Sequence, residues 1–515
     1  MFGVADEKVY PEAAIFKGRT LATTYRMESA KENLQRWLTS CRRHHSLCEE
    51  TGSLAEFPTR VVDLGPPGKE LRPRLREPPP GFIDSHKFVF MSYLWGTVPQ
   101  FMLTSENWDS LQKVIDFKDI ALLHQQAFSL LHSLGYQYVF LDALCVMFGD
   151  NLAANRELLR LSKYIESADL VLAATTNNPA EALIGEDPGK NETIRLEARM
   201  QDNEARSFNV TLRKPLRSVA EVVQHDVANR GWRIQEALLA RRLVVFGWDQ
   251  IYWTCLHCTR SEGNPSPIYS SETLKFSTLR AQLEARSAKD EREVVLQLLR
   301  KQWYTIVETA SRGKFTYEGD RLLGIDSFAA TWDTYKEEYI SDVGIWRNDL
   351  VQGLLWIHNC DPFEPQGYGA GGRPSWSWAH MGLPVTHPFS GGLELSRWLG
   401  TENEFRCIEA GSKLHIQAPS IRATASDLCR KFQYFFDIRH HQDMNWVDWN
   451  DDFDSFVLVI VAPWAYRPSL GKLVAKWVGL VLQESNGALT RRGVFIGPEV
   501  GSDLTEWVIG ECFIV

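Results

Sequence analysis

The pattern of apolar and polar positions in the first half of the chain alternates between two periods. Three short runs are apolar on both faces, as in the buried strands of a parallel sheet: residues 86–93, 137–147 and 169–176. The segments between them, 105–134 with one break and 151–167, have the spacing of helices. This order of strand, helix, strand, helix and strand predicts right-handed crossovers and a parallel α/β sheet.

An amphipathic helix is predicted before this block, over residues 30–48. Residues 57–83 are rich in proline, glycine and charge, which predicts a loop with one short strand at 59–64. The apolar face of the helix carries Leu34, Trp37, Leu38, Cys41, His45 and Cys48.

After the third strand, residues 177–225 are polar and mixed in charge, which indicates an insertion. A helix is predicted at 231–240. It is followed by strands at 242–246 and 250–255, joined at Gly247-Trp248-Asp249.

The second half changes from helical to β-rich. Helical spacing covers 285–311 and much of 320–360, and residues 361–382 are rich in proline and glycine. In the last part, strands at 479–483 and 492–496 flank Asn486-Gly487, a strong hairpin signal, and two more are predicted at 456–461 and 506–515.

These changes divide the chain into four predicted parts. Residues 1–85 hold a helix and a short strand that lead into an α/β domain at 86–260. A helical, Trp-rich segment at 261–382 precedes a β-rich domain at 383–515. Because a buried indole N–H needs a partner, the tryptophans of Pro374-Ser375-Trp376-Ser377-Trp378 are predicted to anchor interior turns.

Composition limits the partners and the compartment. A net charge of −9 argues against a nucleic-acid partner, because binding to a phosphate backbone needs a basic face. The longest apolar run, 456–462, is too short to span a membrane. Nine cysteines in a chain whose N-terminus has no secretory signal indicate free thiols and a cytoplasmic protein.

Polar and aromatic side chains stand at the ends of the first two predicted strands. Ser92, Tyr93 and Trp95 end the first strand, and Asp142 lies inside the second. Carboxyl ends of parallel strands meet at one edge of a sheet, where α/β proteins gather their sites.

A second polar block opens the helix at 231–240. It contains Arg230, Trp232, Gln235 and Glu236, ahead of an apolar run. We expect this block and the strand ends to face each other across one cleft.

Several short blocks follow one another in an order known from one family. In chain order they are Trp37-x3-Cys41-x3-His45-x2-Cys48, Pro58-Thr59-Arg60-Val61-Val62-Asp63, Ser92-Tyr93-Leu94-Trp95-Gly96, Leu134-Gly135-Tyr136-x-Tyr138-x3-Asp142, Tyr164-x3-Ala168, Arg230-Gly231-Trp232-x2-Gln235-Glu236 and Pro374-Ser375-Trp376-Ser377-Trp378-Ala379. Together they resemble the fungal heterokaryon-incompatibility (HET) domain family, whose members act in non-self recognition and regulated cell death.

The resemblance extends distantly to TIR domains and implies a TIR/flavodoxin-like parallel sheet. In catalytic TIR domains a helix glutamate assists cleavage of NAD at the nicotinamide bond, and Glu236 stands at the matching place, with Asp142 as a second candidate catalytic carboxylate. NAD then enters as a substrate, and no bound cofactor is implied. The candidate substrate-binding residues are Ser92, Tyr93, Trp95, Arg230, Trp232 and Gln235.

Structural interpretations of the same residues carry equal or greater weight. Glu236 can form an ion pair with Arg230 or Arg242. Tyr93 and Trp95 can pack as core. Asp142, as a carboxylate in an apolar strand, can be a hydrogen-bond hub with Arg230 as its partner.

The cysteines are expected to be structural as well. Cys145 has no histidine near it in the sequence, which favours a buried free thiol. Cys41, His45 and Cys48 could build a zinc site with Cys255-x2-Cys258, but the first three share the apolar helix face. We therefore expect core packing and no metal.

Three departures from the family pattern keep a second function open. Gln126 stands where the family has a carboxylate, Phe148 where it has an amide, and Arg233 where it has a small or polar residue. The first hypothesis is a cell-death effector, with TIR-like cleavage of NAD as its candidate activity. The second is a HET-scaffold enzyme of fungal secondary metabolism, such as a cyclase or isomerase, and the third a degenerate binding protein. All imply a small-molecule or nucleotide partner and allow a homo-oligomer.

Overall fold

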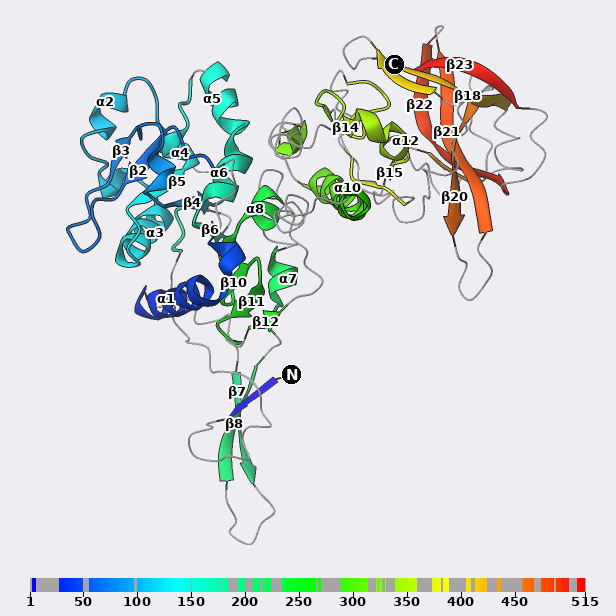
Figure 1. The fold of residues 1–515 in the computed structure, drawn as a ribbon. Coiled ribbons are helices and arrows are strands. Elements are labelled where there is room, and N and C mark those ends of the chain that lie inside the picture. The colour runs from blue at the N-terminus through cyan, green and yellow to red at the C-terminus, as the bar shows by residue number, and fades with distance from the viewer. Residues whose placement is uncertain are drawn as a thin grey trace. The chain divides into compact units, whose positions relative to one another are not determined.

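The chain divides into two units in its computed structural model (Figure 1). The first unit comprises residues 1–228 and 233–285, and the second comprises 229–232 and 286–515. The four predicted parts remain a prediction. The structure describes residues 2–5, 27–49, 55–96, 100–149, 151–176, 178–183, 193–199, 207–213, 216–223, 234–264, 267–269, 289–313, 321–322, 324–326, 329, 339–358, 373–380, 383–388, 404–408, 413–423, 433–436, 456–466, 474–485, 488–499 and 507–514.

A nine-stranded sheet is the centre of the first unit (Figure 1). Strands β5, β4 and β6 are parallel, as predicted, and β9 joins them as a fourth parallel strand. Antiparallel strands extend both sides, so the whole sheet is mixed rather than parallel. From edge to edge the strands are β12 (Ile268–Tyr269), β11 (Cys258–Ser261), β10 (Ile251–Cys255), β9 (Arg242–Phe246), β6 (Leu170–Ala174), β4 (Phe88–Ser92), β5 (Tyr138–Leu141), β2 (Val61–Asp63) and β3 (Arg74–Arg76).

The order of the parallel strands reverses between β4 and β6. From β4 the chain moves to β5 on one side, and then returns to β6 and β9 on the other. Every residue of the four parallel strands is buried, which explains why these runs are apolar on both faces. Open α/β sheets bind ligands outside the carboxyl ends of their strands at such a reversal of strand order.

The helices of the first unit differ from their predictions at several boundaries. The second predicted strand ends at Leu141, and Asp142 begins a short helix instead of lying inside the strand. The segment 105–134 forms three short pieces, and Gly135 follows the last of them at φ +92°, as a helix-ending glycine does. The predicted helix at 151–167 is two helices. The bounds are α2 (Trp108–Leu111), the 3₁₀ turn η4 (Phe117–Asp119), α3 (Leu122–Ser133), α4 (Asp142–Cys145), α5 (Asn151–Leu158), α6 (Leu161–Ser167), α7 (Val219–Val222) and α8 (Ile234–Leu239), with a further 3₁₀ turn η3 (Phe82–Asp84) before β4.

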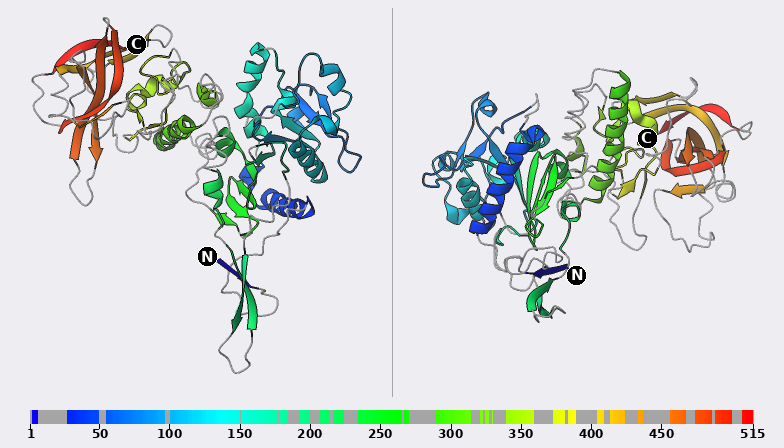
Figure 2. Two further views of the ribbon diagram at one scale, coloured as in Figure 1. Left: turned by 180° about the vertical axis from the view of Figure 1, so that it is seen from behind. Right: turned by 60° about the horizontal axis from the view of Figure 1, so that its bottom comes forward.

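The predicted N-terminal helix is a helix followed by a sharp turn. Helix α1 (Met27–His44) ends before His45, whose backbone at φ −123° and ψ 85° leaves the helical region. The 3₁₀ turn η2 (Ser46–Cys48) follows. Helix α1 lies against β10, on the side of the sheet seen in the right-hand view of Figure 2.

The predicted insertion forms strands of its own. β7 (Thr193–Arg199) and β8 (Ser207–Arg213) pair antiparallel, and β1 (Phe2–Ala5) adds to β8 as the third strand of this small sheet.

The second unit holds one long helix and a second sheet. Helix α10 (Lys289–Arg312) covers the predicted 285–311, whereas 320–360 contains short strands besides helical turns. The Asn486-Gly487 hairpin is confirmed by the pairing of Ser485 with Ala488, although the two turn residues lie outside the described residues. The elements are β13 (Tyr339–Ile340), β14 (Ile345–Trp346), the 3₁₀ turn η8 (Arg347–Asp349), α12 (Leu350–Gly353), β15 (Ile357–His358), β16 (Val385–Thr386), and the seven sheet strands β17 (Glu404–Ile408), β18 (Lys413–Ala423), β19 (Gln433–Phe436), β20 (Phe456–Tyr466), β21 (Val474–Ser485), β22 (Ala488–Glu499) and β23 (Val508–Ile514).

The predicted tryptophan anchors are part of this second unit. Trp376 and Trp378 are fully buried, and Trp378 Nε1 donates to the Gly344 carbonyl at 2.9 Å. Gly344 has φ +74°, and a Cβ there would lie 2.4 Å from the Trp378 ring nitrogen, so only glycine fits this turn. No helix in the described part of the chain is long and apolar enough to cross a membrane.

Candidate functional site

The carboxyl edge of the parallel strands brings together three of the predicted site residues. Tyr93 and Trp95 follow β4, and Asp142 follows β5, whose Leu141 is paired with Met91 of β4. The indole Nε1 of Trp95 donates a hydrogen bond to Asp142 Oδ2 at 2.8 Å. Trp95 and Asp142 are only half-buried, so this pair can be reached from outside.

Two opposing influences act on the pKa of Asp142, and burial is the larger of them. Burial raises the pKa of the Asp142 carboxyl, while hydrogen bonds from Trp95 and from the Ala143 N–H, at 2.7 Å, act in the opposite direction. Burial and the nearby Asp142 carboxylate together raise the pKa of Tyr93 well above its usual value. The Tyr93 hydroxyl is therefore neutral at physiological pH and able to donate a hydrogen bond. The predicted partner Arg230 lies outside the described residues, as does Trp232.

His124 is a member of this group that the sequence pattern did not reveal. It lies on α3, and its ring packs edge-on against Tyr93 with 4.4 Å between centroids. Burial lowers the pKa of His124 to about 4, so the imidazole is neutral at pH 7. The only signal in the sequence is a histidine on a helix face that is otherwise apolar.

Besides the Tyr93 hydroxyl, which interacts with Asp142, two buried polar atoms of this group lack a hydrogen-bond partner among the described residues. They are the hydroxyl oxygen of Ser92 and Nε2 of His124. Buried polar atoms are nearly always paired with protein, water or a ligand. Both atoms are thus available for a hydrogen bond beyond those that the described residues make.

An aromatic side chain, Phe148, packs beside the Trp95–Asp142 pair. The Phe148 ring packs against Trp95 in an edge-to-face arrangement, with 5.2 Å between centroids. Gln100 donates to the Trp95 carbonyl at 3.1 Å and holds the loop after β4. Phe148 thus adds an apolar ring beside the Trp95–Asp142 pair.

Gln235 and Glu236 are buried on α8, which packs on α6. Within the described ranges, no hydrogen bond or ion pair joins them to the Trp95–Asp142 pair. Arg242, one predicted partner of Glu236, instead forms ion pairs with Asp169 and Glu49. The other, Arg230, is not described. The described contacts therefore assemble Ser92, Tyr93, Trp95 and Asp142 without Glu236.

The amino edge of the same strands holds a buried ion network. Asp169, just before β6, accepts from Arg242 at 3.1 Å, from Arg42 at 2.6 Å and from the Tyr136 hydroxyl at 2.7 Å. Lys87 lies 3.2 Å away. These cations hold the pKa of Asp169 well below its usual range despite burial. The network joins α1 to the starts of the four parallel strands β4, β5, β6 and β9.

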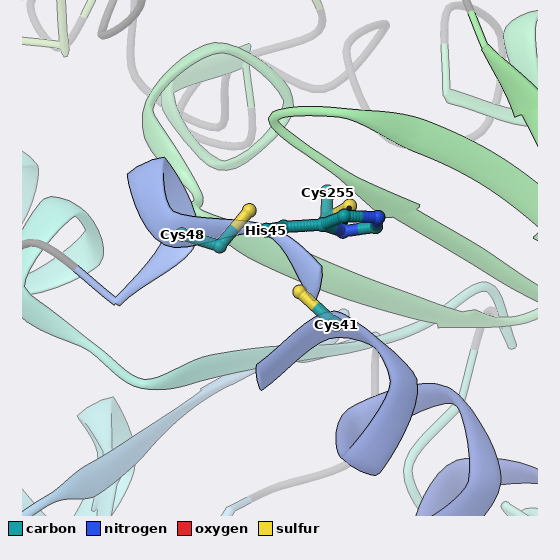
Figure 3. Close-up of side chains that lie close together, drawn as sticks. All are labelled: Cys41, His45, Cys48 and Cys255. Atoms are coloured by element: carbon teal, nitrogen blue, oxygen red, sulfur yellow. Dashed lines mark hydrogen bonds between the residues drawn. The ribbon is translucent and has the colours of Figure 1, made fainter. Parts of the chain in front are cut away.

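Four predicted structural residues gather beside this network. Cys41, His45, Cys48 and Cys255 are all buried, and their ligand atoms lie within 4.8 Å of one another. Figure 3 shows the four side chains pointing toward one centre, three from the α1–η2 segment and Cys255 from the end of β10. The expected shared helix face holds for Cys41 alone, because α1 ends before His45. The four residues together form a set of metal-binding donors.

One comparison with known proteins gave a match. The model of the family described as heterokaryon incompatibility protein (HET) matches residues 88–236. The match runs from β4 into α8, and so it includes both the carboxyl-edge group and Glu236. No curated protein and no solved structure was found to match the chain. Residues 88–236 of this chain are a HET domain, as the order of the sequence blocks predicted.

Proposed function

We propose that this chain acts in non-self recognition and regulated cell death, and that its HET domain binds and cleaves NAD at the carboxyl edge of the sheet. The observation that supports this site is the Trp95–Asp142 hydrogen bond, which joins the carboxyl ends of β4 and β5. It lies beside the point between β4 and β6 where the strand order reverses. Ligands of open α/β sheets bind at such points.

The strand order supports the TIR-like part of the proposal. Counted along the chain, the parallel strands stand in the order second, first, third, fourth. This is the order of flavodoxin-like sheets, in which the ligand sits between the first and third strands. Tyr93 follows the first strand, β4, and so stands beside that point.

The chemistry of the group suits cleavage of an N-glycosidic bond. Water adds to the ribose C1′, and nicotinamide leaves with the bonding electrons, through a transition state with oxocarbenium character. Asp142 is the carboxylate that stabilises this positive charge or orients a ribose hydroxyl. Trp95 and Phe148 offer aromatic faces for the nicotinamide or the adenine, and Glu236 is the second candidate carboxylate.

Purified full-length protein incubated with NAD tests this proposal through the release of nicotinamide. Asp142→Asn should lower the rate by roughly 10²–10⁴-fold, the range for a positioned acid or base. The matched control is Asp119→Asn, an exposed carboxylate of η4, which should leave the rate unchanged. Comparing Glu236→Gln with Glu181→Gln, an exposed control, tests the second carboxylate in the same way.

The outcomes separate the activity from the site. No nicotinamide above a no-protein blank would overturn NAD cleavage by the isolated chain. Turnover that survives Asp142→Asn would overturn the assignment of the site to the carboxyl edge.

A second candidate function rests on the apolar character of this edge. Phe148 packs on Trp95 where the family has an amide, which favours an apolar or aromatic substrate over a dinucleotide. An enzyme of secondary metabolism, such as a cyclase or isomerase, would bind an apolar substrate against these two aromatic rings. An apolar fluorescent probe that quenches Trp95 emission and is not displaced by NAD would favour this function, and displacement by NAD would oppose it.

A further inference from the structure

We propose that Cys41, His45, Cys48 and Cys255 bind one zinc ion in a closed structural site at the amino edge of the sheet. This proposal is independent of the activity proposed for the carboxyl edge. It rests on the positions of the four donors, on their burial and on the groups that surround them.

The donors have the geometry of a tetrahedral site. A tetrahedral zinc with Zn–S bonds of about 2.3 Å and Zn–N bonds of about 2.0 Å keeps its ligand atoms roughly 3.5–3.8 Å apart. Here His45 Nδ1 lies 3.4 Å from Cys255 Sγ, and all four ligand atoms lie within 4.8 Å of one another. Three sulfurs and one imidazole nitrogen form a donor set that selects zinc among the common divalent ions.

The local backbone explains how one segment supplies three ligands. Cys41 lies on the last turn of α1, and the His45 N–H still donates to the Cys41 carbonyl at 2.9 Å. The chain then leaves the helix at His45, and the Cys48 N–H donates back to the His45 carbonyl at 3.0 Å. This turn brings Cys48 to the same side as Cys41 (Figure 3).

The fourth ligand comes from a remote strand end. Cys255 closes β10, where it is paired with Arg242 of β9, and it lies more than two hundred positions from Cys41 in the sequence. Helix α1 contacts β10, so packing of the apolar helix face delivers the three donors to Cys255. Both ligand segments lie outside residues 88–236, before and after the HET match.

The surroundings stabilise negative charge on sulfur. Arg242 Nε donates to Cys41 Sγ at 3.3 Å, and the Cys258 N–H donates to Cys255 Sγ at 3.4 Å. Metal-bound thiolates are held by donors of this kind.

Burial assigns the site a structural role. The four side chains are at most 6% exposed, and the His257 ring covers His45 with 4.5 Å between centroids. A complete set of four protein ligands leaves no open position for water or substrate. Zinc would therefore tie the segments before and after the HET match into one folded body.

Cys258 is a nearby sulfur outside this set. Its Sγ lies 3.9 Å from Cys255 Sγ, a distance at which no disulfide exists. Both its sulfur and its backbone N–H contact Cys255 Sγ, but Cys258 is not among the four residues whose ligand atoms cluster within 4.8 Å. We therefore expect Cys258 to support the site without binding the metal.

The test is the metal content of the full-length protein, purified without chelators from zinc-supplemented cells. Elemental analysis should find one zinc per chain after gel filtration. Cys48→Ser and Cys255→Ser should each lose it. Cys145→Ala is the matched control, because Cys145 is a buried free thiol of the same unit outside the cluster, and it should retain the zinc. Cys258→Ser should retain it too.

A second measurement covers the case in which the ligand variants do not fold. X-ray absorption at the zinc edge of the wild-type protein should show three sulfur neighbours and one nitrogen neighbour. A shell dominated by oxygen, or wild-type protein without stoichiometric zinc, would overturn the site. Zinc retained by folded Cys255→Ser would overturn it as well, and zinc lost on Cys258→Ser would overturn the ligand set.

Discussion

The two edges of the parallel strands in the first unit are built in opposite ways. At the carboxyl edge, Trp95 and Asp142 are half-buried, and the buried atoms Ser92 Oγ and His124 Nε2 have no partner among the described residues. At the amino edge, Asp169 and Arg242 are buried and multiply paired. Open, partly unsatisfied polar groups suit ligand binding, whereas closed networks suit stability.

The two edges also join different parts of the chain. The carboxyl-edge group comes from β4, α3, and the residues after β5, all within 88–236. The amino-edge groups tie that region to α1 before it and to β9 after it. We infer that the folding unit is larger than the HET match, while the candidate site lies wholly inside it.

Arg242→Met should give the largest change in stability. It leaves the buried Asp169 carboxylate without its closest cation partner on the sheet. Removing one partner of a buried ion pair costs about 3–5 kcal/mol, and we expect the lower end because Arg42 and Lys87 remain. Chemical denaturation followed by tryptophan fluorescence measures the change, with the exposed Arg72→Met as control. If Arg242→Met and Arg72→Met had equal free energies of unfolding, the ion network at the amino edge would not stabilise the fold.

Acid should weaken the two edges in different pH windows. The folded pKa of His124 is about 4, below its unfolded value, so the unfolded chain binds a proton that the folded chain does not. Stability then falls as pH drops from about 6.5 to about 4, by up to about 1.4 kcal/mol per pH unit. For Asp169 the folded pKa is lowered, so its contribution is present above about pH 4 and is lost only below it.

The variant His124→Gln separates these windows. It should flatten the stability profile between pH 4 and 6.5 and leave the loss at lower pH in place. His132→Gln, a partly exposed histidine on the same helix, is the control and should keep the wild-type profile. An unchanged slope in His124→Gln would mean that His124 is not buried as a neutral imidazole in solution.

Tyr136→Phe should cost less than Arg242→Met. It removes one hydroxyl donor to Asp169 but no charge, and a hydrogen bond to a charged group contributes about 1.5–3 kcal/mol. Denaturant midpoints of the two variants, measured side by side, give the comparison. If Tyr136→Phe lost more unfolding free energy than Arg242→Met, the hydroxyl hydrogen bond would stabilise Asp169 more than the charge of Arg242 does.

Trp95→Phe should be the mildest change in stability and a severe one in ligand binding. It keeps the aromatic contact with Phe148 but removes the N–H that reaches Asp142, at about 0.5–1.5 kcal/mol for a typical hydrogen bond. Because Asp142 is half-exposed, a water molecule can replace the lost donor and restore part of this free energy. Thermal unfolding together with the nicotinamide assay checks both, and a variant with unchanged turnover would place the site elsewhere.

Periodicity predicted the local structure well where burial was uniform. The runs around Phe88, Tyr138 and Leu170 became parallel strands because only a strand covered on both faces is apolar throughout. It failed at Asp142, because an apolar stretch of 137–147 does not reveal where a strand becomes a helix. Periodicity also did not predict β7 and β8 in the polar insertion. These strands pair with each other, and β8 also pairs with the distant β1.

By itself, the sequence determined the elements, the family and the polar groups at the first strand ends, since these depend on local spacing and on ordered motifs. Only the tertiary structure decided which residues meet. It joined Trp95 to Asp142, added His124 to that group, and brought Cys255 to the cysteines and histidine of α1 and η2. The reason is physical: partners far apart in the chain are selected by strand order and by the packing of a helix face on a sheet, and neither is encoded in the spacing of any one segment.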